Sequence, residues 1–201
     1  MNIAYLNQGD SWYPAQLQRD LAEDAPARIS VLGNPDILKE KKIAFFCSSK
    51  CPGDIIIKTY DLAKKWRDDG VTVIGGFHSP VEQECLTVLL RGKQPVIVCP
   101  ARSIEEMRIK EEYKKPLEEG RLLILSASDK KERRITSETS QTRNRFVAAI
   151  ADEIIIAHAE PSGRTEHLLQ QIFARGKPVF TFRCKHNDNL LTAGAKPLFE
   201  Q

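Results

Sequence analysis

The sequence predicts an α/β fold, a doubly wound, mainly parallel, Rossmann-like sheet preceded by a short N-terminal lead-in segment. Two observations predict it. Short, continuously apolar runs rich in β-branched residues recur along the chain, and segments with helical spacing of their apolar residues separate these runs. Strands that are apolar on both faces are typical of a parallel sheet covered by helices on both sides.

The predicted strands and helices alternate from residue 43 to residue 182. We expect strands at 43–47, 71–74, 95–99, 122–125, 153–157 and 178–182. We expect helices at 54–69, 80–90, 110–119, 139–151 and 163–175. A ligand of such a sheet binds beyond the carboxyl ends of the strands, so the turns that follow the strands are the candidate sites.

Two segments differ from this alternation. Residues 1–40 contain three prolines and show little periodicity, so we interpret them as a lead-in packed on the Rossmann-like domain formed by residues 41–201. Residues 126–140 are polar, with a charged centre at 130–134. Because this stretch is long for a connection in a compact domain, we expect either a functional loop or a mobile one.

The composition narrows the class of protein. The chain has 201 residues, of which 41% are hydrophobic, so it can bury a core of its own. It contains no apolar run near the ~20 residues of a membrane span and begins with polar residues, so we expect no membrane partner and no secretory signal. Five cysteines without a regular framework indicate a reducing, cytoplasmic location. Cys47 and Cys51 do not have the C-x-x-C spacing of a zinc site, so we expect neither a metal nor a cofactor.

The first two candidate sites follow the first two predicted strands. Cys47-Ser-Ser-Lys50 offers hydroxyls, a lysine and free backbone N–H groups to a phosphate, at Ser48, Ser49 and Lys50, although an ordinary polar turn is the alternative. In the second turn, Ser79 and Glu82 have the spacing of a capping box, which explains both residues without a ligand. It does not explain the residues before them, so we interpret these as candidate ligand contacts: Gly75, Gly76 and His78.

The third and fourth candidate sites begin helices. Arg143, Asn144 and Arg145 suit phosphate contacts, because the arginine fork binds phosphate through two hydrogen bonds. Residues two apart on a helix point about 200° apart, so we expect only one of the two arginines to face a pocket. The fourth site combines small residues with the N–H groups of a helix N-terminus, which favour an anion. Its candidate residues are Ser162, Gly163, Arg164 and Thr165.

Seven stretches, in order over about residues 12–198, resemble the DNA-processing protein A family (DprA, also called Smf). The most specific is Arg143-Asn-Arg145 with the following Ala151-Asp152, which is similar to the family's R-N-R-x-I-A-x-L-S-D. Gly70–Gly76 is similar to G-V-x-V-V-S-G. The other five are Trp12–Leu17 (Y-P-x-x-L), Ile29–Pro35 (L-x-x-x-G-N), Ser162-Gly163 (S-G-S-L-x-T-A), Gly176–Phe180 (G-R-x-V-F) and Asn189–Ala195 (N-x-L-I-x-x-G-A).

The resemblance implies a Rossmann-like domain that binds single-stranded DNA, forms a homodimer and helps to load the recombinase RecA during DNA uptake and recombination. The chain also departs from the family pattern. Ser49 replaces the arginine of the family's G-S-R, and His78–Glu82 replaces A-R-G-I-D. Fewer arginines imply weaker phosphate affinity and a shallower salt dependence. With no C-terminal winged helix expected, the chain resembles a divergent, stand-alone member of the SMF/LOG superfamily.

Two other functions remain open for the same turns. Pro161–Glu166 resembles the P-G-G-x-G-T-x-x-E turn of LOG-type nucleotide phosphoribohydrolases. In such an enzyme, Glu82 or Glu166 would be the catalytic residue at the N-glycosidic bond, and Arg145 would hold the 5′-phosphate. A non-catalytic sensor of a nucleotide-derived ligand is the other alternative. We expect the first function, binding of single-stranded DNA or a nucleotide phosphate without catalytic residues.

Overall fold

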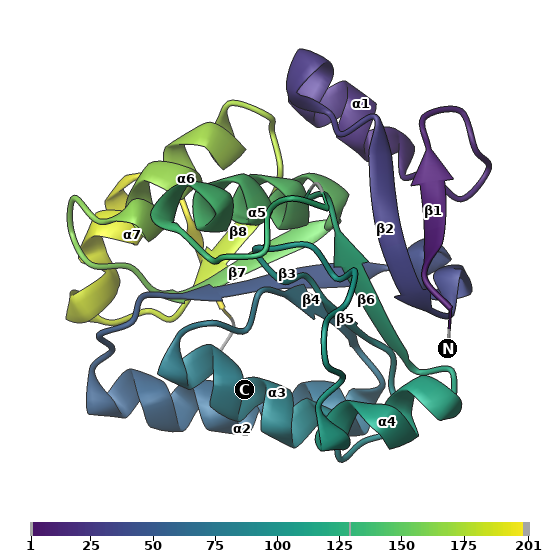
Figure 1. Ribbon diagram of the computed structural model, residues 1–201. Coiled ribbons are helices and arrows are strands. Elements are labelled where there is room, and N and C mark those ends of the chain that lie inside the picture. The colour runs from purple at the N-terminus through teal and green to yellow at the C-terminus, as the bar shows by residue number, and fades with distance from the viewer. Residues whose placement is uncertain (1, 129, 199–201) are drawn as a thin grey trace.

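One continuous sheet organises the molecule. A computed structural model describes residues 2–128 and 130–198, and within them nine strands form a sheet of order β1-β2-β6-β5-β4-β3-β7-β8-β9 (Figure 1). Strands β3 to β8 pair in parallel with one another, and β9 (Lys196–Pro197) extends them in parallel beside β8. The six predicted strands are all present, with ends that differ from the prediction by no more than one residue: β3 (Lys42–Cys47), β4 (Thr72–Gly75), β5 (Val96–Val98), β6 (Leu122–Ser126), β7 (Glu153–His158) and β8 (Val179–Thr181).

The strand order reverses beside β3. The chain proceeds from β3 through β4 and β5 to β6 on one side, then continues with β7 on the other side of β3 and moves outward to β8 and β9. At such a switch point the connections of two adjacent strands leave toward opposite faces of the sheet and open a crevice. The turns after β3 and β7 are therefore neighbours in space, although more than a hundred residues separate Cys47 from His158 in the sequence.

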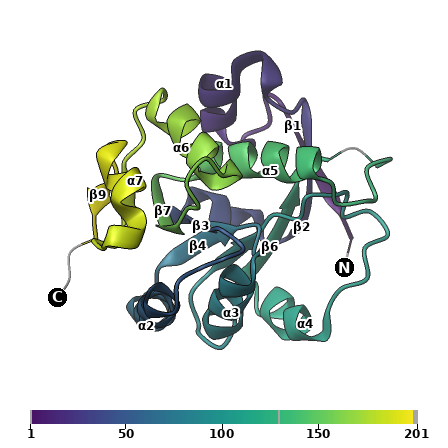
Figure 2. The same ribbon diagram turned by 90° about the vertical axis from the view of Figure 1, so that its left-hand side faces the viewer.

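Helices cover both faces of the sheet, which confirms the doubly wound class. α2 (Gly53–Asp69), α3 (Pro80–Leu89) and α4 (Glu111–Glu118) lie on one face, and α1 (Ala15–Leu21), α5 (Ser137–Ile150) and α6 (Arg164–Phe173) on the other (Figure 1, Figure 2). α7 (Asp188–Thr192) follows β8. Successive strand residues point to opposite layers: Phe45 packs in the α2 layer and Phe46 in the α5 layer. Among the described residues, no helix has the length and apolar character needed to cross a bilayer.

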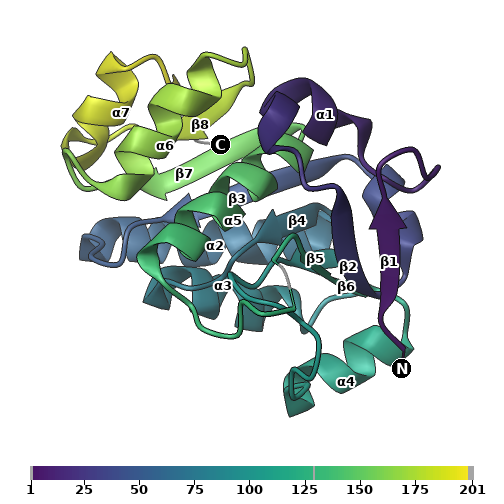
Figure 3. The ribbon, with the colours of Figure 1, turned by 45° about the horizontal axis from the view of Figure 1, so that its top comes forward.

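The lead-in contributes two strands that the sequence analysis did not predict. β1 (Ala4–Asn7) pairs antiparallel with β2 (Arg28–Gly33), and β2 pairs antiparallel with β6, with Val31 opposite Leu125. Figure 3 shows these two strands at one edge of the sheet and α7 toward the opposite edge. Residues 4–33 therefore extend the same sheet as the parallel strands, and α1 packs against α5.

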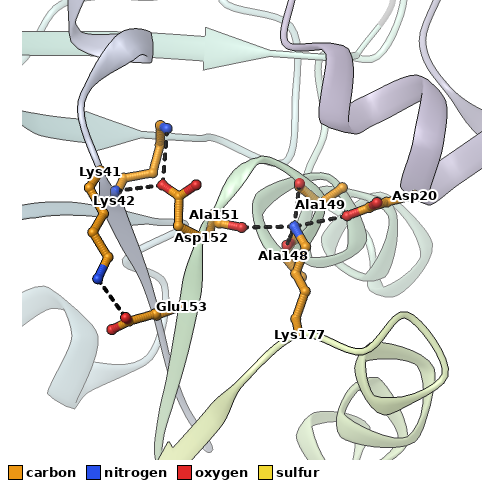
Figure 4. A network of polar contacts seen from close by, with 9 residues as sticks. All are labelled: Asp20, Lys41, Lys42, Ala148, Ala149, Ala151, Asp152, Glu153 and Lys177. Carbon is orange, nitrogen blue, oxygen red and sulfur yellow. Dashed lines mark hydrogen bonds and ion pairs between the residues drawn. The ribbon is translucent and has the colours of Figure 1, made fainter.

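A buried lysine fixes the end of α5. Nζ of Lys177 donates to the carbonyl oxygens of Ala148, Ala149 and Ala151 and lies 2.9 Å from Oδ2 of Asp20 on α1 (Figure 4). Carbonyls at a helix C-terminus lack partners within the helix, and here one ammonium group satisfies three of them. Burial lowers the pKa of Lys177, while Asp20 opposes this shift. The contact joins the lead-in to the helix that carries Arg143.

Candidate functional site

A cavity of about 690 Å³ opens at the carboxyl edge of the sheet, where the turns after β3, β4 and β7 meet the first half of α5. It therefore lies at the reversal of the strand order. Eight of the predicted site residues line it: Ser48, Ser49, His78, Arg143, Asn144, Gly163, Arg164 and Thr165. Five do not line it: Lys50, Gly75, Gly76, Arg145 and Ser162.

Ser48 joins the turns on the two sides of the crevice. Its amide N donates to the carbonyl oxygen of His158 over 2.9 Å. Its Oγ accepts from the amide N of Glu160 at 3.1 Å and donates to Oγ1 of Thr165 at 3.3 Å. The neighbouring Ser49 is exposed and has its side chain available to the cavity. Lys50 is not among the lining residues, and its ammonium lies 3.9 Å from the carboxylate of Glu160, which is one of them.

Glu82 organises the second turn. As the sequence predicts, Ser79 and Glu82 form a capping box at the start of α3. The carboxylate does more than close the box: Oε1 accepts from the amide N of Cys47 at 3.0 Å, and Oε2 accepts from the amide N of His78 at 2.7 Å and of Ser79 at 3.2 Å. Burial raises the pKa of Glu82, and these amides together with Arg143 oppose the rise. Glu82 thus ties the end of β3 to the turn after β4.

The two glycines of this turn make room for side chains of the protein itself. A Cβ atom on Gly75 would lie 3.1 Å from the Phe77 ring, and one on Gly76 would lie 1.5 Å from Nη1 of Arg143. The sequence analysis assigned both glycines to close approach of a ligand, whereas in the structure the guanidinium of Arg143 occupies the space beside Gly76. His78 is exposed and lines the cavity beside this turn.

The two arginines of α5 diverge, as their helical spacing predicts. Arg143 is buried, with 8% of its surface exposed, and lines the cavity. Its Nη1 donates to the carbonyl oxygen of Cys99 at 3.0 Å and its Nε to Oδ1 of Asn144 at 2.7 Å. Burial lowers the pKa of Arg143, and the carboxylate of Glu82 opposes this effect. Arg145 instead faces the lead-in, where Nη1 lies 3.8 Å from Oδ2 of Asp24.

The turn after β7 is held in an unusual backbone conformation. Ser162 has a φ of 59°, and its amide N donates to Oε2 of Glu166 at 2.6 Å. Oε1 of Glu166 in turn accepts from Nδ2 of Asn189 at 2.5 Å. A Cβ atom on Gly163 would lie 2.8 Å from the carbonyl oxygen of Glu160, so this close turn requires glycine. Its geometry directs Gly163, Arg164 and Thr165 into the cavity while Ser162 stays outside.

The first turn of α5 supplies lining residues that sequence reasoning missed. Thr136 caps the helix through reciprocal contacts with Thr139. Thr136, Ser137 and Ser140 add hydroxyl groups to the cavity, and Ile135, which is 47% exposed, adds an apolar side chain at its edge. The concentration of hydroxyl residues at 136–140 was the available signal.

The charged loop before α5 is partly held by acidic neighbours. Nζ of Lys130 lies 3.2 Å from Glu105, and Nη2 of Arg133 lies 3.0 Å from Glu106. The amide N of Ser103 donates to the Glu132 carbonyl at 2.8 Å. These contacts attach the loop to the segment after β5 and keep its positive charge near the carboxyl edge of the sheet.

The comparisons with known proteins identify the family. The model of the DNA recombination-mediator protein A family matches residues 4–201. This chain belongs to that family. No curated protein sequence matches it.

Solved structures agree in fold. DNA processing protein A (DprA) from Streptococcus pneumoniae has a TM-score of 0.81 at 19% identity, over 98% of this chain and 71% of that one. DprA from Helicobacter pylori, whose structure is described as giving insights into its single-stranded DNA binding mode, has a TM-score of 0.79 at 21% identity, over 100% of this chain and 92% of that one. A molybdenum cofactor carrier protein from Chlamydomonas reinhardtii has a TM-score of 0.54 at 12% identity, over 80% of this chain and 91% of that one.

Metal ligands do not gather in this site. Within residues 2–128 and 130–198, no group of three or more His, Cys, Asp or Glu side chains is arranged to hold a metal ion.

Proposed function

We propose that this protein binds single-stranded DNA, with phosphates held in the cavity at the switch point of the sheet. The observation that carries this proposal is the convergence of three turns and the first half of α5 on that cavity. Each contributes hydroxyl groups, backbone N–H groups or a guanidinium, which are the groups that bind phosphate oxygens in proteins. The cavity volume of about 690 Å³ is in the range of small-ligand sites, so the cavity accommodates a short stretch of single-stranded DNA.

The cations of the site have different roles in this proposal. Arg164 is exposed at the start of α6, where its side chain can adjust its position to bind a phosphate. Arg143 lies at the floor, and its contacts with Cys99 and Asn144 fix its orientation. Lys131 and Arg134, both exposed, extend the positive charge along the loop before α5. A polynucleotide can contact floor and loop together, which a single nucleotide cannot.

Glu82 and Glu166, the two alternatives for the catalytic residue of a hydrolase, are both engaged in holding the turns. Both oxygens of Glu82 accept hydrogen bonds from backbone N–H groups. In Glu166, Oε2 accepts from the amide N of Ser162 and Oε1 accepts from Nδ2 of Asn189. A general acid or base must exchange a proton with substrate, which these contacts oppose. This arrangement favours binding over hydrolysis of an N-glycosidic bond.

Membership of the family supports the biological setting that we propose. DprA from Helicobacter pylori is described as binding single-stranded DNA, and we extend that ligand to this chain. We further propose a role in DNA recombination in the cytoplasm, with RecA as a partner and a homodimer as the assembly. Size-exclusion chromatography with light scattering, and co-purification with RecA in the presence of an oligonucleotide, test these two additions.

The direct test of DNA binding is fluorescence anisotropy with a labelled oligonucleotide at two salt concentrations. We expect binding at low salt that weakens as salt rises, because each phosphate contact releases counterions. Arg164→Ala should weaken binding and reduce the salt slope by about 0.7 for one lost contact. The matched control is Arg91→Ala, which removes the same charge at the far end of α3 and should leave binding unchanged.

Competition separates the remaining alternatives. Unlabelled oligonucleotide should displace the probe at far lower concentration than a nucleoside monophosphate. No binding at low salt, or equal effects of the two arginine substitutions, would overturn the proposal. Release of free base from monophosphates, followed by chromatography, would favour the hydrolase instead.

A further inference from the structure

A smaller cavity, of about 200 Å³, lies between α5 and α6, and we call it the α5–α6 groove. The two helices pack side by side on the same face of the sheet (Figure 1, Figure 2). The groove is lined from α5 by Gln141, Asn144 and Arg145, and from α6 by Arg164, His167, Leu168 and Gln171. Positions i, i+3, i+4 and i+7 share one face of a helix, so each helix presents one stripe of side chains to the groove.

The stripes that face this groove are polar and positively charged. They bring together the guanidiniums of Arg145 and Arg164, the imidazole of His167 and three carboxamides, with Leu168 as the apolar member. Among the described residues that line the groove, none carries a carboxylate. A lining that combines guanidiniums with N–H donors and excludes carboxylates favours an anion.

Arg145 is available to such an anion. Its Nη1 lies 3.8 Å from Oδ2 of Asp24, which is too long for a hydrogen bond, and 76% of the Asp24 side chain is exposed. An exposed ion pair of this kind contributes little free energy, so Arg145 can exchange it for a phosphate. The sequence analysis assigned Arg145 to phosphate binding, and the cavity at the switch point leaves this side chain unused.

The groove continues directly from that cavity. Gln141, Asn144 and Arg164 line both, so no other element of the fold separates them. A polynucleotide carries a phosphate on every nucleotide. A strand that fills the cavity and runs on past these three side chains therefore brings further phosphates to Arg145 and His167.

We propose that the α5–α6 groove is a second phosphate subsite, which binds the strand beyond the stretch held in the cavity. The fork of Arg145 binds the phosphate oxygens, and the N–H groups of His167 and Gln171 donate to them. The strand thus crosses from the carboxyl edge of the sheet onto the outer surface of the helices α5 and α6. This inference rests on the proposed function and extends it to a longer ligand.

The first test places a negative charge inside the groove and the same charge just outside it. Gln171→Glu adds a carboxylate to the lining, whereas Gln170→Glu adds one at the adjacent exposed position, about 100° away around α6 and outside the lining. At about 0.1 M salt, screening confines such charges to roughly 10 Å. We expect Gln171→Glu to bind a labelled oligonucleotide about fivefold more weakly than wild type, and Gln170→Glu less than about twofold more weakly.

The second test removes the guanidinium that belongs to the groove alone. Arg145→Ala should weaken binding of the oligonucleotide about threefold to tenfold and reduce the salt slope by about 0.7 for one lost phosphate contact. Arg91→Ala is again the matched control and should leave both quantities unchanged. Urea denaturation checks that each variant is folded.

The outcomes separate the groove from the cavity. Equal affinities of the two glutamate variants, or a salt slope of Arg145→Ala equal to that of wild type, would refute the second subsite. If Arg164→Ala still weakened binding in that case, the proposed function would stand without the groove. Failure of wild-type protein to bind the oligonucleotide at low salt would overturn the proposed function and the subsite with it.

Discussion

The guanidinium of Arg143 lies directly against the backbone of Gly76, so close that a Cβ atom there would come within 1.5 Å of Nη1. Arg143 also donates to the carbonyl oxygen of Cys99, which follows β5. A side chain from α5 thereby reaches across the carboxyl ends of β4 and β5. The conformation of the cavity floor depends on the absence of one methyl group.

We expect Gly76→Ala to lower the free energy of unfolding by about 1–3 kcal/mol, because the methyl group displaces a buried, hydrogen-bonded guanidinium. Urea denaturation measures this change. Gly53→Ala is the control: its Cβ meets nothing within 4 Å, and it lies at the first residue of α2, where alanine is the better helix former. Equal stability of the two variants would contradict the close packing.

Asp20 is expected to make part of the stability acid-sensitive. Burial raises the pKa of this carboxyl, but hydrogen bonds from Arg19 and Lys177 outweigh it and hold the pKa below the ordinary value of 3.8. A lowered folded-state pKa stabilises the protein above the unfolded value, and this contribution disappears as pH falls through the folded value. Asp20→Asn should therefore cost about 1–3 kcal/mol at pH near 6 and much less at pH near 2.

Urea unfolding of wild type and Asp20→Asn at both pH values measures this difference. Asp36→Asn removes the carboxylate of an exposed pair with Lys39 and should change stability by less than about 1 kcal/mol. If the difference in the free energy of unfolding between wild type and Asp20→Asn stayed constant from neutral to acid pH, the carboxylate would contribute by its shape rather than by its charge.

Glu166 is expected to position the turn after β7. Glu166→Ala removes the acceptor of the Ser162 amide and of the Asn189 side chain, so the turn should relax and bind a labelled oligonucleotide about threefold to tenfold more weakly. A weaker affinity would be informative, because the loss of a negative charge by itself strengthens binding to DNA. Glu84→Ala, an exposed substitution of the same charge on α3, should bind as well as wild type or slightly better. Tighter binding by Glu166→Ala would show that the carboxylate acts only by repulsion.

The parallel strands were predictable because each is a buried apolar run between polar turns, as in residues 122–126. The strand pair of the lead-in was not predicted, although the run from Ile29 to Leu32 is buried and apolar apart from Ser30. A short pair of antiparallel strands at the edge of a sheet has only a weak sequence pattern when neither the partner strand nor the turn between the strands is recognised. β1 has four residues, of which Leu6 alone is buried.

The site was predictable to the extent that strand ends determine it. The rule that ligands bind beyond the carboxyl ends brought Ser48, His78 and Gly163 to one cavity. It does not determine where a long side chain points: Lys50 turns toward Glu160 and Arg145 toward Asp24. The hydroxyls at 136–140 were missed because their position depends on how the preceding loop folds back.

The hydroxyl of Ser48 links two turns that the sequence keeps far apart: it accepts from the amide N of Glu160 and donates to Oγ1 of Thr165. Ser48→Ala would remove this side-chain link, while the hydrogen bond from the Ser48 amide N to the carbonyl oxygen of His158 and the pairing of β3 with β7 would remain. The sheet would then keep its shape while the mutual orientation of the two turns above it became variable.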